Sequence, residues 1–231
     1  MKTDNASIYR LAGRDALFAL LVLGSLWGLS EVALGQAVRA LAPEIRAGVL
    51  TGIGMACMGL FIGLTGRPGR LPLLALVTVL ATQLCVPLLR CSPLCKANTS
   101  LAIMLHGIVI AGAVRLIAAG PGSGAVRRGT AAFAAALVSA TVFYYAGMRL
   151  APCAYLLSFN QPLGLFSFML REGLVWAAFS AALFPAGYAL GARWAVPLAS
   201  YGASRPLMRL AAPGAFVALC WTAIAAVVLA G

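Results

Sequence analysis

The fold class follows from one stretch of sequence, residues 16–36, which reads ALFALLVLGSLWGLSEVALGQ. About 20 apolar residues in a helix are enough to cross the hydrocarbon core of a bilayer. This run contains one ionisable residue, Glu31. It is longer than the apolar region of a secretory signal peptide and shows no convincing small-residue cleavage site. We therefore expect a membrane-spanning helix of the mature protein here.

Six further apolar runs of similar length follow, so the sequence predicts seven spans. They lie at residues 46–66, 71–89, 101–120, 130–151, 173–193 and 211–231. The alternative for the last run is a position on the membrane surface. That would leave six spans, with both ends of the chain on the cytoplasmic side. Between the fifth and sixth runs, residues 151–170 are apolar but interrupted by prolines and amides, which is typical of a re-entrant or interfacial loop.

The composition supports an all-α integral membrane protein with a single polytopic domain over residues 1–231. Apolar residues make up 62% of the chain and charged residues 10%, whereas a soluble domain has about a quarter charged residues. The runs do not alternate apolar with polar residues, as transmembrane barrel strands do. The net charge of +12 does not indicate nucleic-acid binding, because the basic residues fall singly or in pairs between the apolar runs.

The distribution of basic residues predicts a cytoplasmic N-terminus, because cytoplasmic segments carry an excess of Lys and Arg. With this orientation, eleven basic residues lie inside, namely Lys2, Arg10, Arg14, Arg67, Arg70, Arg115, Arg127, Arg128, Arg193, Arg205 and Arg209. Six lie outside, namely Arg39, Arg46, Arg90, Lys96, Arg149 and Arg171.

Polar residues at helix depth gather in the predicted outer half of the bilayer. An ionisable residue inside a membrane is costly unless it faces a cavity or a partner, and it marks a functional site by default. The candidates for binding a solute are Glu31, His106, Glu172, Asn98, Asn160 and Gln161. The alternatives are a packing role for His106 and an ion pair of each carboxylate with a basic neighbour. The sequence therefore predicts a polar pocket that opens outward.

The pocket hypothesis extends to the charge of the solute. We expect Glu31, His106 and Glu172 to receive a cationic or metal-bearing small molecule, since two carboxylates and an imidazole are a ligand set for nickel, cobalt or zinc. The competing account is an internal salt bridge from Glu31 to Arg39 or Arg46. The identity of any metal stays open, and the sequence identifies no cofactor.

Glycines lie on one face of each of the first two spans. Gly24 and Gly28 share a face of the first helix, and Gly52 and Gly59 share a face of the second. Such faces allow close approach of another helix. We expect these glycines to pack the first two helices together, and the alternative is that one face binds a partner subunit.

Three cysteines lie in predicted outer loops: Cys91, Cys95 and Cys153. Cysteines in an oxidising compartment tend to pair, so a disulfide is expected among them, although the sequence does not select the pairing. Redox-active outer cysteines would also fit a quinone-linked thiol oxidoreductase. Motifs of other enzyme classes, such as a P-loop or HExxH, are absent from the sequence.

The first helix, with Leu26-Trp27-Gly28-Leu29-Ser30-Glu31 followed by Gly35, resembles the substrate-binding S components of energy-coupling factor (ECF) transporters. The resemblance implies a bundle of about six helices in the bacterial cytoplasmic membrane, with a substrate pocket near the outer face. It also implies that Gly24 and Gly28 contact a coupling subunit that works with ATPases.

The resulting expectation is a non-enzymatic binding and translocation subunit for a small, vitamin-like or cationic solute, surrounded by lipid and working with other membrane subunits. A non-catalytic subunit of a multi-subunit membrane redox complex is the alternative, and the thiol oxidoreductase is the less favoured one.

Overall fold

A computed structural model describes residues 11–88, 96–118, 124–204 and 206–230 of the chain, and this part contains helices but no strand. The long helices are α1 (Gly13–Leu41), α2 (Arg46–Thr65), α3 (Leu71–Gln83), α5 (Ala97–Ala118), α6 (Ala125–Leu150), α9 (Leu174–Ser204) and α10 (Pro206–Ala230). The short elements are η2 (Pro43–Ile45), η3 (Pro68–Arg70), α4 (Cys85–Leu88), α7 (Ala154–Leu157), α8 (Gly164–Phe168) and the π-helical turn η5 (Met169–Gly173).

Seven helical segments of this described part are long and apolar enough to cross a membrane. Each overlaps one of the seven runs predicted from the sequence, and the segment at residues 211–229 is one of them. The predicted all-α membrane bundle is therefore confirmed. Large apolar side chains such as Leu80, Ile108 and Leu219 are more than half exposed, as expected of side chains that contact lipid.

The segment between the fifth and sixth spans is more helical than the predicted loop. Residues 151–170 contain α7, a turn with Leu163 at a φ of +63°, and α8. The turn η5 then connects α8 directly to α9. The sixth span accordingly begins at Gly164, nine residues earlier than the apolar run at 173–193 predicted.

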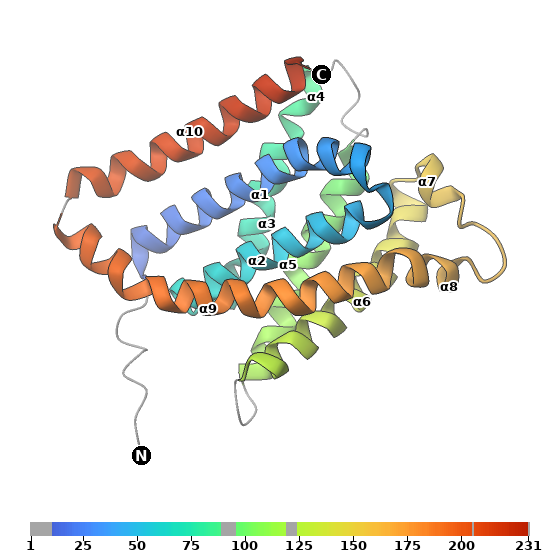
Figure 1. The fold of residues 1–231 in the computed structure, drawn as a ribbon, viewed down its shortest axis with the longest axis horizontal. Coiled ribbons are helices and arrows are strands. Elements are labelled where there is room, and N and C mark those ends of the chain that lie inside the picture. The colour runs from blue at the N-terminus through green and yellow to red at the C-terminus, as the bar shows by residue number, and fades with distance from the viewer. Residues whose placement is uncertain (1–10, 89–95, 119–123, 205, 231) are drawn as a thin grey trace.

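The helices pack in an order that differs from their order in the chain. α2 lies along α9, α1 packs on α3, α2 and α10, and α5 lies between α3 and α6 (Figure 1). α10 is held to α1 by Trp221, whose Nε1–H donates to Ser25 Oγ at 2.9 Å. The seventh helix is thus part of the bundle.

The glycines of α2 bring its backbone against that of α9. A Cβ atom at Gly59 would lie 2.2 Å from the Phe184 carbonyl oxygen, and one at Gly187 would lie 2.2 Å from the Ala56 carbonyl oxygen. Gly52 faces the Phe179 side chain in the same way. Only residues without a side chain allow two helices to approach so closely.

The glycines of α1 face α3. A Cβ atom at Gly24 would lie 2.8 Å from the Val77 side chain, and one at Gly28 would lie 2.6 Å from the Ala81 side chain. The prediction that the glycine faces pack α1 against α2 is therefore wrong. Both faces are covered within the chain, but by α3 and α9, so they are not free to dock a partner subunit.

Candidate functional site

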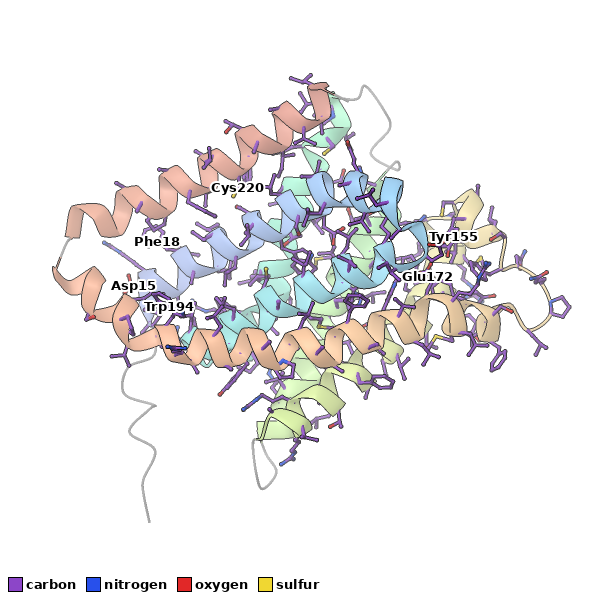
Figure 2. The ribbon with its side chains drawn as sticks, in the orientation of Figure 1. Asp15, Phe18, Tyr155, Glu172, Trp194 and Cys220 are labelled. Carbon is purple, nitrogen blue, oxygen red and sulfur yellow. The ribbon has the colours of Figure 1, made fainter. Side chains whose placement is uncertain are left out.

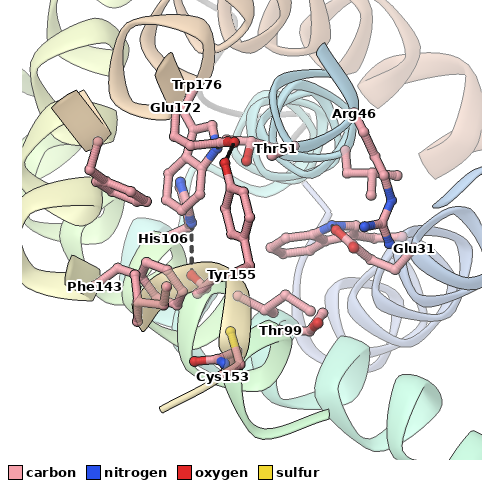
Figure 3. Close-up of a pocket in the computed structure, with 18 residues that line it drawn as sticks. Glu31, Arg46, Thr51, Thr99, His106, Phe143, Cys153, Tyr155, Glu172 and Trp176 are labelled. Carbon is pink, nitrogen blue, oxygen red and sulfur yellow. Dashed lines mark hydrogen bonds between the residues drawn. The ribbon is translucent and has the colours of Figure 1, made fainter. Parts of the chain in front are cut away.

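A cavity of about 380 Å³ lies toward one end of the bundle, lined by the middle and second half of α1, the first half of α2 and α5, the second half of α6 and the start of α9. Figure 3 shows its wall. The α7 helix contributes part of its wall. In Figure 2, Tyr155 and Glu172 of this site lie at one end of the molecule, and Asp15 lies toward the other. The volume is in the range of pockets that bind small organic molecules, about 300–1,000 Å³.

The cavity brings together four of the six predicted solute-binding residues: Glu31, Asn98, His106 and Glu172. They come from α1, α5 and the π-helical turn before α9. Single π-helical turns within longer helices occur frequently at functional sites. The other two, Asn160 and Gln161, are exposed in the segment between α7 and α8 and do not line the cavity.

The Glu31 carboxylate is held by an indole one helical turn earlier. Trp27 Nε1–H donates to Glu31 Oε1 at 3.0 Å. Trp27 is only 2% exposed, and Gly54 of α2 makes room for its ring, since a Cβ atom there would lie 2.4 Å from the indole. Glu31 is thereby fixed on the wall of the cavity.

The proposed ion pair of Glu31 is not formed among the side chains that the structure describes. Arg46 lines the cavity on the same side as Glu31 (Figure 3), but its Nε–H donates to the Gly35 carbonyl oxygen at 2.8 Å. The Arg39 side chain lies outside the described ones.

Glu172 accepts two hydrogen bonds, one at each carboxylate oxygen. The Tyr155 hydroxyl donates to Oε1, and Trp176 Nε1–H donates to Oε2 at 3.2 Å. Desolvation raises the pKa of Tyr155 above its ordinary value, and the hydrogen bond to Glu172 and the negative charge of that residue raise it further. Tyr155 therefore stays protonated and available as a donor.

His106 is 4% exposed and leaves one ring nitrogen without a partner. Its Nδ1 lies 2.7 Å from the Ala102 carbonyl oxygen. Because a carbonyl oxygen only accepts, Nδ1 carries a proton, and in the neutral ring Nε2 is then an acceptor. Nε2 is buried and has no hydrogen-bond partner. Asn98 Oδ1 is a second buried acceptor without a partner on the same wall.

Aromatic rings form much of the remaining wall. Trp176 packs against Phe143 with ring centroids 5.6 Å apart and against His106 at 5.2 Å. Phe168 contacts both Phe143 and Trp176, each at 6.2 Å. These mutual contacts fix the rings, so the cavity has a rigid apolar side.

The predicted metal site is not present among the described residues, which contain no group of three His, Cys, Asp or Glu side chains able to hold one ion. The reason lies in the hydrogen bonds. The two carboxylates are fixed on different helices by different indoles, and His106 is turned toward its own helix backbone. The prediction of a nickel, cobalt or zinc site from these three residues is therefore wrong.

The predicted disulfide of Cys153 is also absent. Cys153 is a free thiol that lines the cavity, so pairing with Cys91 or Cys95 is contradicted. Those two cysteines themselves lie outside the described residues.

Several residues of the site were not found from the sequence. Trp27, Trp176 and Tyr155 hold the two carboxylates, and Phe143 and Phe168 complete the apolar wall. A signal was available for the tryptophans, because each lies four residues from a glutamate and residues at this spacing meet on one helix face.

Comparison of the chain with protein-family models, with curated proteins and with solved structures finds no match.

Proposed function

We propose that this multi-pass membrane protein binds a small solute in the cavity described above and carries it across the membrane together with partner subunits, without converting it chemically. One observation carries the proposal. Residues from five of the seven spans and from α7, including two of the five acidic residues of the chain, converge on one cavity toward one end of the bundle. A purely structural subunit has no need of such a cavity, because carboxylates at this depth are costly.

The cavity faces the outside in this proposal, with the chain in the bacterial cytoplasmic membrane and its N-terminus in the cytoplasm. With all seven candidate spans crossing, the ends of α1 and α6 and the starts of α2, α5 and α9 lie on the side opposite the N-terminus. The excess of basic residues belongs to the N-terminal side, as the positive-inside rule requires. The solute is therefore taken from outside.

The resemblance of the first helix to ECF S components supports the same function, since those proteins bind substrate in a small helical bundle and rely on other subunits for energy. The glycine face of α1 is covered by α3, so a coupling subunit would bind another surface of this chain. The rival function of a structural subunit loses the feature that favoured it. The glycine faces are not free for neighbours in a complex. Cys91 and Cys95, on which the thiol oxidoreductase depends, lie outside the described residues.

A cavity-filling substitution tests the proposal. Ala102 lines the cavity, and Ile108, which follows it in α5, is 52% exposed on the lipid side. The purified protein should be stabilised against thermal unfolding by the small-molecule fraction of a rich growth medium. We expect Ala102→Phe to abolish this stabilisation and Ile108→Phe to retain it. Equal stabilisation of both variants, or none of the unsubstituted protein, would contradict the proposal.

A further inference from the structure

Two tryptophan–glutamate pairs line the cavity from different helices. On α1, Trp27 donates to Glu31 four residues later, and at the start of α9, Trp176 donates to Glu172 four residues earlier. Figure 3 shows Glu31 and Glu172 on different sides of the cavity. Each indole N–H satisfies one carboxylate oxygen, so the pairs present carboxylates in a fixed position beside an aromatic face.

The charge of the cavity is opposite to that of the chain. The chain carries a net charge of +12, whereas the cavity wall has two carboxylates, Glu31 and Glu172, and one guanidinium, Arg46. With His106 neutral and both glutamates ionised, the lining residues carry one formal negative charge, and Lys96 lies near Glu31 outside the lining. A charge without a counter-charge is unfavourable in a low-dielectric site, so a negatively charged wall favours a positively charged solute.

The buried polar atoms of the wall that lack a partner are acceptors. His106 Nε2 and Asn98 Oδ1 have no hydrogen-bond partner, and a buried acceptor without one is unfavourable because it has lost its hydrogen bond to water. A solute that donates hydrogen bonds removes this cost. A solute with acceptors alone leaves these atoms unsatisfied.

The apolar side of the cavity selects an organic cation over an inorganic one. No group of three ligands able to hold a metal ion exists among the described residues, while Trp27, Phe143, Phe168 and Trp176 all line the cavity. Aromatic faces attract organic cations through the ring quadrupole and bury their apolar parts.

We propose that the solute is a small organic cation with at least one N–H donor and an apolar or aromatic body, bound with its charged group in the field of the Glu31 and Glu172 carboxylates and its body against Trp176 and Phe143. This assignment rests on the proposed function and adds the chemical class of the solute. Arg46 lines the Glu31 side, so a zwitterion is the closest competing class.

Four compounds of matched size test the charge. They are the 2-phenylethylammonium ion, 2-phenylethanol, 3-phenylpropionate and phenylalanine, which are a cation, a neutral molecule, an anion and a zwitterion. Binding to the purified full chain in detergent is measured by isothermal titration calorimetry. We expect the cation to bind at least about tenfold more tightly than each of the others, since a charge-assisted hydrogen bond is worth about 1.5–3 kcal/mol.

Substitutions of the two glutamates then test whether the cavity carboxylates cause the preference for the cation. Glu31→Gln and Glu172→Gln keep the shape of the side chain, and each should weaken binding of the cation about tenfold or more. Glu44→Gln is the matched control, because Glu44 is exposed and does not line the cavity, and it should bind as the unsubstituted protein does.

The inference is overturned if phenylalanine, the alcohol or the anion binds as tightly as the cation, if none of the four binds at millimolar concentration, or if both cavity variants bind the cation like the control. The comparison of the four compounds needs no variant, so it stands even if a substitution impairs folding. The proposed function has a separate readout, because stabilisation by the growth-medium fraction and its loss in Ala102→Phe do not depend on the charge of the solute.

Discussion

The close contact of α2 and α9 yields a prediction for Gly59→Ala. The added Cβ atom would lie 2.2 Å from the Phe184 carbonyl oxygen, whereas ordinary contact begins at 3.4 Å. The difference of 1.2 Å has to come from separation of the two backbones, because a carbonyl oxygen cannot rotate away as a flexible side chain can. A gap of about 0.5–1 Å already removes a quarter to a half of the dispersion energy of the atoms along it.

The expected loss of stability follows from two opposing effects. Overpacking costs about 1–3 kcal/mol, and a contact with backbone belongs at the upper end of that range. Replacing glycine by alanine within a helix gains about 0.5–1 kcal/mol. We therefore expect Gly59→Ala to lower the free energy of unfolding by about 2 kcal/mol. Solute affinity should also fall, because α2 and α9 each supply a wall of the cavity.

Equilibrium unfolding in mixed micelles of a mild detergent and SDS, followed by circular dichroism, measures this loss. The matched control is Gly112→Ala in α5, where no atom lies within 4 Å of the added Cβ, and which should be unchanged or slightly more stable. If Gly59→Ala proves as stable as Gly112→Ala, the account of α2–α9 packing is refuted.

Three further predictions concern single side chains. Because its pKa is raised, Tyr155 should ionise only above its ordinary value of 10.0, and its contribution to stability should be lost as the pH rises beyond that value. A spectrophotometric titration should show this tyrosine missing in Tyr155→Phe and shifted partly back in Glu172→Gln, since desolvation remains the largest cause. As a free thiol beside the cavity, Cys153 should be alkylated without prior reduction by a membrane-impermeant maleimide added outside intact cells, and modification only from the cytoplasmic side would reverse the proposed orientation. Ser25→Ala leaves the Trp221 N–H without its acceptor, so stability in mixed micelles should fall by about 1 kcal/mol, and an unchanged value would show that α10 is held by apolar contacts alone.

The spans and the end of the bundle that holds the site could be predicted from the sequence. Hydropathy gives the bounds of each span. Because successive spans cross the membrane in opposite directions, these bounds also give the side of the membrane on which each helix end lies. Glu31 lies in the second half of the first span, and His106 and Glu172 lie in the first half of spans that run the opposite way. They were therefore expected at one end, and they line one cavity there.

The contacts within that end could not be predicted, because helical periodicity gives the face of a residue but not the neighbour of that face. The glycine face of α1 meets α3 and that of α2 meets α9, since helix order in space is decided by packing of the whole bundle. The prediction of a metal site was wrong for a related reason. Each glutamate accepts a hydrogen bond from the tryptophan four residues away. This local contact competes with the binding of one metal ion by both carboxylates.

Asn160 and Gln161 show the limit of reasoning from polarity alone. They lie at the same end as the cavity, but the turn at Leu163 and the start of the sixth span at Gly164 leave them exposed. Amides in a connecting segment are satisfied by water, so their presence in a membrane protein does not by itself indicate a binding site.

Native mass spectrometry of the detergent-purified chain, after incubation with the small-molecule fraction of a rich growth medium, tests the central claim most directly. The account predicts one added mass of a small organic molecule per chain, absent from Ala102→Phe and retained in Ile108→Phe. A spectrum without any added mass, or the same added mass in Ala102→Phe, would contradict the claim that this cavity binds a solute.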